Sequence, residues 1–263
     1  MNVLDSFKLD GKVAVVTGGA GKYGYQLVEA LAEAGATVYV ASRNRANNYE
    51  RLKGLIDSGY DIRILEFDLE DVDSIIKLCD DVYAEAGKVD VLVNNAVLRL
   101  SGSGYNVASP ECFDRSMHAN ATSLFVISRA FGDRMAKDGG GSIINIGSYM
   151  GILGVDYELY AGTEMCPNGS VGDYFFFKGG MTNYTRFLAS HYGRAGVRVN
   201  CIELGGLRTN QPELFQERYC KKTMLGRMAN NTDVKGLIVY LASDASEYMT
   251  AAIIPLDGGY HAK

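Results

Sequence analysis

The sequence predicts an α/β fold, a doubly wound parallel sheet of about seven strands with helices on both faces. Three observations predict it. Short runs rich in valine and isoleucine are apolar on consecutive residues, as strands covered on both faces are. Longer segments with apolar residues at three- and four-residue spacing separate these runs, which is the pattern of amphipathic helices. A glycine-rich turn joins the first apolar run to the first helical segment.

The alternation of the two patterns places each element in chain order. The expected strands occupy residues 12–18, 36–42, 61–67, 89–96, 141–148 and 197–203. The expected helices occupy residues 25–35, 72–87, 118–140 and 181–196. Glycine stands at the end of each of these helices, which is a common helix stop. Alternating strands and helices form right-handed crossovers, so we expect the ligand beyond the carboxyl ends of the strands.

Two stretches between these elements, residues 101–111 and 149–173, are expected to be long loops. Long loops in compact domains are commonly functional. No repeat, low-complexity tract or linker interrupts the pattern, so we expect one domain over residues 1–263.

Charge and composition exclude several classes of partner. The net charge of −5 comes from 31 acidic and 26 basic residues mixed along the chain. Because no block of like charge occurs, the sequence favours neither a nucleic acid nor an anionic membrane as a partner. A small soluble molecule fits better.

The cysteines and the N-terminal segment indicate the compartment. The five cysteines are widely spaced and contain no C-x-x-C pair, which argues against a disulfide framework and against a zinc or other metal site. The N-terminus lacks a basic stretch followed by an apolar core, and no run approaches the roughly 18 apolar residues of a membrane span. We therefore expect a cytoplasmic protein.

The turn after the first strand has the spacing G-x-x-G-x-x-G, from Gly18, Gly21 and Gly24. Small residues let the backbone turn sharply and approach a pyrophosphate, which then lies at the N-terminus of the following helix. A P-loop does not fit, because its first glycine would fall on Val16 and its final hydroxyl on Tyr23. The turn predicts a dinucleotide site.

The end of the second strand bears on the choice between NAD and NADP. An acidic residue there would accept from the ribose 2′-hydroxyl and repel a 2′-phosphate. This strand ends in Ser42 followed by Arg43, and Lys22 adds a second cation nearby. A hydroxyl and a guanidinium suit a phosphate, so the sequence favours NADP over NAD. The alternative is that Arg43 and Lys22 are solvated charges at the starts of helices.

Tyr174 and Lys178 stand four residues apart in the stretch GDYFFFKGG. Residues at this spacing share one helical face, while the three phenylalanines between them turn to other faces. A free phenol titrates near ~10, and a cation beside it favours the phenolate. Tyr174 can then exchange a proton with a hydroxyl or carbonyl oxygen.

Several motifs now stand in a fixed order. They are TGGAGKYG after the first strand, NNA after the fourth, HAN at the start of a long helix, NIGS after the fifth strand, and YFFFK. In order and placement they resemble the short-chain dehydrogenase/reductase family, and the likeness continues through residues 197–209 and 225–260. The resemblance implies a Rossmann-type fold and an NAD(P)-dependent oxidoreductase.

The resemblance also implies roles for four residues. Tyr174 is the expected acid/base, and Lys178 is expected to hold the nicotinamide ribose and lower the tyrosine pKa. Ser148 is expected to hydrogen-bond the reacting oxygen. Asn120 is expected to brace a water-linked proton relay through Lys178. A serine-hydrolase reading fails, because none of the three histidines falls at a plausible base position in this fold.

The cofactor contacts that the resemblance implies lie on loops after the strands. They are Gly18, Gly21, Lys22, Tyr23, Gly24, Ser42, Arg43, Asp68, Leu69, Asn95, Ala96, Val97, Leu207 and Thr209. Two of them depart from the family pattern, because Lys22 and Val97 stand where glycine is usual. Lys22 leaves the turn with the glycine spacing of the longer, epimerase-like branch of the family, whereas the Val97 departure concerns local loop shape rather than chemistry.

The interval from Ser148 to Tyr174 is about twice as long as the family's usual one. The extra residues, 154–173 (here called the substrate segment), leave and return beside the expected site, so we expect them to shape substrate selection. Tyr157, Glu158 and Tyr160 are the candidate substrate contacts, and the segment's hydroxyls and carboxylates suit a polyhydroxylated substrate. The segment also resembles that of a subgroup linked to bacterial surface-sugar and flagellin modification. Whether it is a lid or an oligomer contact stays open.

The sequence thus predicts an oxidoreductase that interconverts a secondary alcohol and a ketone, on a sugar, sugar acid or polyol. One alternative is a nicotinamide-binding sensor or scaffold without turnover. Another is an epimerase or dehydratase that uses the cofactor transiently. Apolar residues on the helices near positions 118 and 176 exceed what a monomer needs, and with the family's habit of pairing these helices they predict a homotetramer or homodimer.

Overall fold

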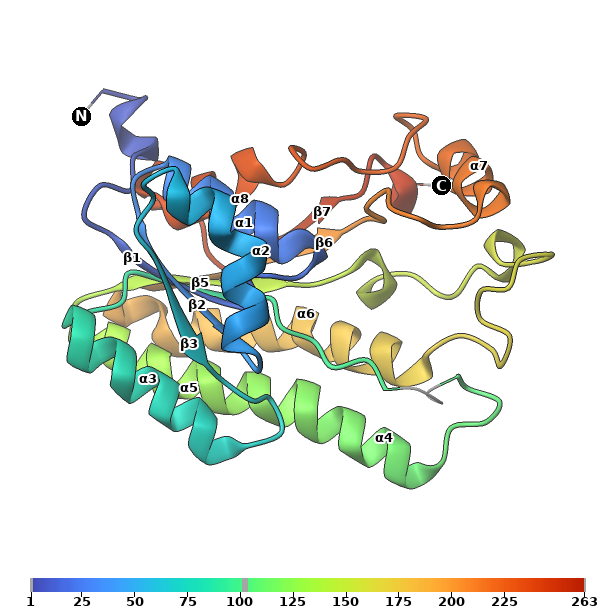
Figure 1. The fold of residues 1–263 in the computed structure, drawn as a ribbon, viewed down its shortest axis with the longest axis horizontal. Coiled ribbons are helices and arrows are strands. Elements are labelled where there is room, and N and C mark those ends of the chain that lie inside the picture. Colours follow the sequence, from blue (N-terminus) through green and yellow to red (C-terminus); the bar gives the residue numbers. More distant parts are fainter. Residues whose placement is uncertain (1, 101–103, 263) are drawn as a thin grey trace.

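The computed structural model describes residues 2–100 and 104–262. Its core is a parallel sheet with the strand order β3-β2-β1-β4-β5-β6-β7 (Figure 1). The strands are β1 (Val13–Thr17), β2 (Thr37–Ser42), β3 (Ile62–Glu66), β4 (Val91–Asn94), β5 (Gly141–Ile146), β6 (Val197–Leu204) and β7 (Ile253–Leu256). The predicted fold class is confirmed, and each of the expected strands is present.

The strand order reverses direction at β1, which lies between β2 and β4. In an open α/β sheet, the crevice beyond the carboxyl ends of the strands at such a point is where ligands bind. β1, β2 and β4 are almost wholly buried, so the position of this crevice is rigidly defined.

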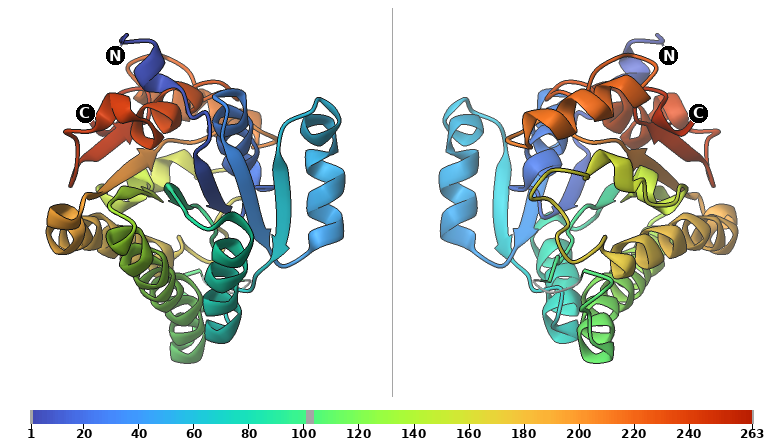
Figure 2. Two further views of the ribbon diagram at one scale, coloured as in Figure 1. Left: turned by 90° about the vertical axis from the view of Figure 1, so that its left-hand side faces the viewer. Right: turned by 90° about the vertical axis from the view of Figure 1, so that its right-hand side faces the viewer.

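Helices cover both faces of the sheet (Figure 2). One face carries α1 (Lys22–Glu33), α2 (Arg45–Asp57) and α8 (Lys235–Ala242). The other carries α3 (Val72–Ala86), α4 (Pro110–Met117), α5 (Ser123–Lys137) and α6 (Gly172–Tyr192). A further helix, α7 (Glu213–Lys222), lies near the substrate segment beyond the sheet (Figure 1).

Several helix boundaries differ from the sequence predictions. α6 begins at Gly172 rather than near residue 181, so it includes Tyr174 and Lys178 in its first two turns. Gly179 and Gly180 disguise this start, because they interrupt the apolar spacing. The predicted helix 118–140 is one π-helical turn, His118–Thr122, followed by α5.

The expected loop 101–111 ends earlier than predicted. Pro110 is the first residue of α4, and the Ser109 hydroxyl caps it by accepting from the Cys112 N–H at 3.2 Å. Residues 101–103 of this stretch lie outside the described part. Helices α2 and α7 were not predicted from the sequence, because both have a weaker amphipathic pattern than α1 or α3.

None of the helices in the described residues is long and apolar enough to cross a membrane. Across the same residues no group of three or more histidine, cysteine or acidic side chains is arranged to hold a metal ion.

Candidate active site

A cavity of about 760 Å³ lies beyond the carboxyl ends of β1, β4, β5 and β6. It is called the site cavity below. Most of the predicted cofactor contacts line it: Gly18, Gly21, Lys22, Tyr23, Gly24, Ser42, Arg43, Asp68, Leu69, Asn95, Ala96, Val97 and Leu207. Ser148, Tyr174, Lys178 and Tyr160 line it as well. Residues from widely separated parts of the chain therefore meet in one space.

Tyr174 and Lys178 lie on one face of α6, as their spacing predicts. Tyr174 is 9% exposed and Lys178 is 3% exposed. The Lys178 ammonium lies 5.7 Å from the centre of the Tyr174 ring and donates to the Ile146 carbonyl at the end of β5. A second cation, the Arg99 guanidinium, lies 4.4 Å from the ring centre. One phenol therefore has two cations close to it.

These charges set the protonation of Tyr174. Burial acts to raise the pKa of the phenol, but the charges of Lys178 and Arg99 and hydrogen bonds from Ser148 and Arg99 act against it. Together they bring the pKa of Tyr174 below its ordinary value. The lowered pKa makes proton exchange with a substrate oxygen easier for Tyr174 than for a free phenol.

Ser148 lies two residues beyond the end of β5 and is 6% exposed. Its hydroxyl accepts from the Met150 N–H at 3.2 Å and hydrogen-bonds the Tyr174 phenol. Its main-chain N–H donates to Glu203 Oε2 on β6. Ser148, Tyr174 and Lys178 thus form one cluster at the wall of the site cavity.

Asn120 is buried on the π-helical turn and does not line the site cavity. Its amide oxygen accepts from the Leu98 N–H and its amide nitrogen donates to the Leu98 carbonyl, both at 2.9 Å. The amide also donates to the Ser116 carbonyl at 3.0 Å. The side chain therefore fastens the loop after β4. π-Helical turns often occur at functional sites, because they reorient one residue of a helix.

The glycine-rich turn fits a pyrophosphate. Gly18 has a φ of +64°, which favours glycine. A Cβ on Gly24 would lie 2.2 Å from the Gly18 carbonyl oxygen, so the first turn of α1 packs too closely for any side chain. The N-terminus of α1 begins at Lys22 and lines the cavity.

The loop after β6 contains a second feature that fits a bound dinucleotide. Thr209 Oγ1 is buried without a hydrogen-bond partner in the described part of the chain. Its own N–H donates to Gln211 Oε1 at 2.8 Å, and Gln211 lines the site cavity although Thr209 does not. A buried hydroxyl without a partner is uncommon, and a phosphate or amide group of a bound dinucleotide would satisfy it. The residues present therefore fit a nicotinamide dinucleotide.

The far end of the site cavity is cationic. Lys22, Arg43 and Arg51 line it, and Arg51 is held by a 2.9 Å hydrogen bond to the Ala20 carbonyl. The Ser42 hydroxyl accepts from the Asn48 amide. Lys22, Ser42 and Arg43 were predicted from the sequence. Arg51 was not, and it reaches this end from the second turn of α2.

The opposite end, which faces Tyr174, has an aromatic wall. It contains Tyr149, Tyr160, Phe215 and Tyr219, with Tyr160 and Phe215 ring centres 5.5 Å apart. Burial raises the pKa of Tyr160 and of Tyr219, in each case to about 12, so both phenols are neutral hydrogen-bonding groups at physiological pH.

Two of the three predicted substrate contacts lie away from this wall. Tyr157 is 55% exposed, and the Glu158 carboxylate pairs with Lys222 on the outer surface. Neither lines the site cavity. The substrate segment folds so that Tyr160, Met165 and Cys166 face the cavity, while its Asp156 and Glu158 carboxylates face α7. The acceptor-rich lining expected from the sequence is therefore replaced by an aromatic and sulfur-containing one.

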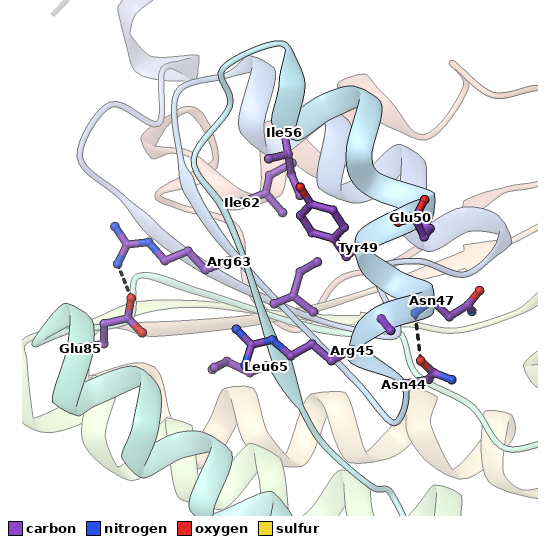
Figure 3. A pocket seen from close by; sticks show the side chains of 12 residues that line it. Asn44, Arg45, Asn47, Tyr49, Glu50, Ile56, Ile62, Arg63, Leu65 and Glu85 are labelled. Atoms are coloured by element: carbon purple, nitrogen blue, oxygen red, sulfur yellow. Dashed lines mark hydrogen bonds and ion pairs between the residues drawn. The ribbon is translucent and has the colours of Figure 1, made fainter.

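A second hollow, of about 960 Å³, lies at the edge of the sheet between α2 and β3 (Figure 3). Tyr49, Ile56 and Ile62 form its floor, and Arg63 pairs with Glu85 at its rim at 2.7 Å. It contains none of the residues around Tyr174. The clustered titratable groups around Tyr174 therefore make the site cavity the candidate reaction site.

Comparisons with known proteins agree with this geometry. The family model described as enoyl-(acyl carrier protein) reductase matches residues 22–261. Galactitol 2-dehydrogenase of Rhizobium johnstonii is 31% identical, over 99% of this chain and 99% of the relative. The 2-dehydro-3-deoxy-D-gluconate 5-dehydrogenase of Escherichia coli is also 31% identical, over 99% of this chain and all of the relative (100%).

Solved structures share the fold over its full length. A gluconate 5-dehydrogenase from Burkholderia cenocepacia, crystallised with NADP and tartrate, matches with a TM-score of 0.87 and 26% identity, covering 100% of both chains. The protein is an NAD(P)-dependent oxidoreductase of the class that interconverts alcohols and ketones. It belongs to the short-chain dehydrogenase/reductase family.

Proposed function

We propose that the protein transfers hydride between nicotinamide and a secondary hydroxyl or keto group of a sugar acid, with a neutral sugar or polyol as the weaker substrate class. The observation that carries the choice of an acid is Arg99. Its guanidinium lies over the Tyr174 ring at the cavity, and no carboxylate pairs with it among the described residues. A cation at this point suits a substrate carboxylate next to the reacting carbon.

The relatives support this substrate class. Their names include dehydrogenases of galactitol and of a deoxygluconate, and the gluconate 5-dehydrogenase structure holds tartrate, a dicarboxylate. The aromatic wall of Tyr149, Tyr160 and Phe215 offers apolar faces and hydroxyls, which suits the mixed character of a sugar chain.

The side chains would divide the work as follows. The bound nicotinamide supplies or accepts the hydride. In the oxidative direction the Tyr174 phenolate takes the proton of the substrate hydroxyl, and the Ser148 hydroxyl donates a hydrogen bond to the same oxygen. Lys178 keeps the phenol ionisable and holds the cofactor ribose. Asn120 positions the loop that carries Arg99, because its amide is bonded to Leu98.

The cofactor preference is for NADP in this proposal. Lys22, Arg43 and Arg51 form a cationic end to the site cavity, and no acidic residue stands at the end of β2. A 2′-phosphate would be attracted there, and the ribose of NAD would find no carboxylate acceptor. Replacing Arg43 by leucine should raise the KM for NADPH more than the KM for NADH.

We place the enzyme in the cytoplasm as a single domain that forms a homodimer or homotetramer. All five cysteines are free, which fits a reducing compartment. Phe125 on α5 and Phe187 on α6 are 45% and 56% exposed on the helices that the family pairs between subunits. Such aromatic exposure favours burial in an interface.

The test is absorbance at 340 nm with a panel of sugar acids, sugars, polyols and simple ketones. We expect turnover with sugar acids and a higher KM for the matching neutral sugars. Replacing Arg99 by methionine should raise the KM for acids and leave that for neutral sugars nearly unchanged. Product formed without net change in the cofactor would instead indicate an epimerase or dehydratase.

Tyr174→Phe separates an enzyme from a cofactor-binding sensor. General acid–base catalysis contributes roughly 10²- to 10⁴-fold, so this variant should lose turnover by at least about a hundredfold. Its affinity for NADPH, followed by fluorescence titration, should stay close to that of the wild type. Cofactor binding without turnover in the wild type, across the whole panel, would favour the sensor.

A further inference from the structure

Glu203 is an acidic side chain in the protein core next to the active site. It lies on β6 and is 0% exposed. It does not line the site cavity, so it touches neither substrate nor cofactor. Burying a carboxyl group costs free energy unless its oxygens are hydrogen-bonded, so its partners indicate what it does.

The partners of Glu203 come from three different elements. Oε2 accepts from the Ser148 N–H just beyond β5. Oε1 lies 2.7 Å from the Thr182 hydroxyl on α6 and 3.5 Å from the Cys201 thiol on β6. Thr182 is one helical turn beyond Lys178 and hydrogen-bonds the Lys178 carbonyl at 3.1 Å. A continuous chain of hydrogen bonds therefore joins Ser148, through Glu203, to the turn that carries Lys178.

The neighbouring strand leaves space for this carboxyl group. A Cβ on Gly147 would lie 2.4 Å from Glu203 Oε2 and 2.8 Å from the Cys201 sulfur. Any larger residue at position 147 would therefore displace the Glu203 carboxyl group or the Cys201 thiol. The absence of a side chain at Gly147 thus provides the space that the Glu203 carboxyl group occupies.

Glu203 is fully buried and forms no ion pair with the described residues, which favours a neutral acid. The Thr182 hydroxyl has a single proton, and two acceptors lie within hydrogen-bond distance, the Lys178 carbonyl and Glu203. If Thr182 donates to the Lys178 carbonyl, Glu203 must carry a proton and donate to Thr182. Every group in the chain is then satisfied. Burial raises the pKa of Glu203, although Thr182, the Ser148 N–H, Cys201 and the charge of Lys178 all act to lower it.

The charge of Glu203 matters for Tyr174. Lys178 lowers the pKa of the phenol through its positive charge, and the same charge acts on Glu203. A carboxylate behind Ser148 would offset that charge and draw the ammonium from the Ile146 carbonyl. A protonated Glu203 keeps its hydrogen bonds and does not offset the effect of the Lys178 charge on the pKa of Tyr174.

We propose that Glu203 is a positioning residue of the active site: as a buried neutral acid it fixes the Ser148 main chain against the turn of α6 that carries Lys178. The kinetic part of its test rests on the proposed function, because it needs a substrate. The spectroscopic part does not.

The spectroscopic experiment is an infrared difference spectrum between wild type and Glu203→Gln at neutral pH. We expect the wild type to show the C=O stretch of a protonated carboxyl group that the variant lacks. Loss of carboxylate bands instead would overturn the proposal. This result holds whether or not any sugar acid is turned over, so it separates failure of this inference from failure of the proposed function.

The kinetic experiment compares Glu203→Gln with Glu203→Ala. The amide keeps the hydrogen bonds, so kcat and the pH profile of kcat/KM should stay near those of the wild type. Alanine removes them, and kcat should fall roughly 10- to 100-fold with little change in the KM for NADPH, as expected when a reacting group is misplaced. If Glu203 were ionised, the glutamine substitution would remove a negative charge and lower the pKa of Tyr174. The rise of kcat/KM with pH would then occur at lower pH than in the wild type, and the proposal would be wrong.

Thr182→Val keeps the proposal testable if the alanine variant does not fold. It removes one link of the chain while leaving the carboxyl group in place, so kcat should fall with NADPH affinity preserved. The matched control is Thr185→Val, which removes another fully buried hydroxyl of α6 that bonds Met181 and Asn145 but not Glu203. Equal kcat values in the two valine variants would contradict the role assigned to Glu203.

Discussion

At the scale of single residues, the chemistry depends on the charge balance around Tyr174. Burial raises the pKa of a phenol, whereas two cations and two hydrogen bonds lower it, and the second group prevails. Lys178 was evident from the sequence because it lies one turn away on the same helix. Arg99 was not, because it comes from the loop after β4 and meets the phenol only in the folded chain.

This balance predicts a pH dependence. In the oxidative direction the phenolate is the base, so kcat/KM should rise with pH and level off above the lowered pKa of Tyr174. Arg99→Met removes a positive charge and raises the pKa of Tyr174, so the rise of kcat/KM should move to higher pH. Arg99→Lys keeps a positive charge and is the control. If kcat/KM rises over the same pH range in the methionine variant and in the wild type, Arg99 does not act on the phenol.

At the scale of the elements, the close approach of α1 to the glycine-rich turn is a steric requirement. Gly24→Ala places a Cβ against the Gly18 carbonyl, which is backbone and cannot move away easily. We expect a lower melting temperature and loss of NADPH binding, measured by thermal unfolding and fluorescence titration.

Gly54→Ala is the matched control for this substitution. Gly54 lies in α2, and a Cβ added there would have no atom of another residue within 4 Å among the described parts of the chain. Alanine in an open helical position is more favourable than glycine by about 0.5–1 kcal/mol, so the melting temperature should rise slightly. A fall in melting temperature equal to that of Gly24→Ala would mean that the close packing of α1 is not the cause.

The substrate segment is held to α7 by charged contacts. Lys222 pairs with Asp156, and Arg218 donates to the Glu158 carbonyl at 2.9 Å. Partial burial acts to raise the pKa of Asp156, but the hydrogen bond and charge of Lys222 outweigh it and the pKa is lowered. The anchor is therefore fully present above the ordinary aspartate pKa of about 3.9 and is lost as the pH falls through the lowered value.

Lys222→Met should release this anchor at neutral pH. We expect faster proteolytic cleavage within residues 154–173 and a higher KM for substrate, while the melting temperature changes little because a partly exposed ion pair contributes only about 0–1 kcal/mol. Lys221→Met, on the same turn but without an ion pair among the described residues, is the control. Equal cleavage rates in the two variants would contradict the anchoring role.

At the scale of the whole molecule, the outer face of α5 and α6 is too apolar for a surface in water. Phe125, Phe176 and Phe187 are each at least 45% exposed. We expect an oligomer by light scattering after size exclusion, and a smaller species for Phe187→Glu. Tyr248→Glu, at a fully exposed tyrosine on another part of the surface, should leave the mass unchanged. A monomeric wild type would show that this face is not an interface.

The sequence by itself determined the fold class and indicated the proposed reacting pair. Apolar runs and helical spacing are local signals, so the six expected strands and the neighbourhood of Tyr174 and Lys178 could be read from consecutive residues. The glycine spacing after the first strand was equally local. Boundaries were less accurate where glycine pairs interrupt the helical pattern, as at the start of α6.

The tertiary structure alone decided which side chains surround that pair. It brought Arg99 and Glu203 to the site and turned Tyr157 and Glu158 away from it. These outcomes depend on contacts between residues far apart in the chain. Spacing along one helix or strand fixes only the direction of a side chain relative to its own element, and what it meets there depends on how the elements pack.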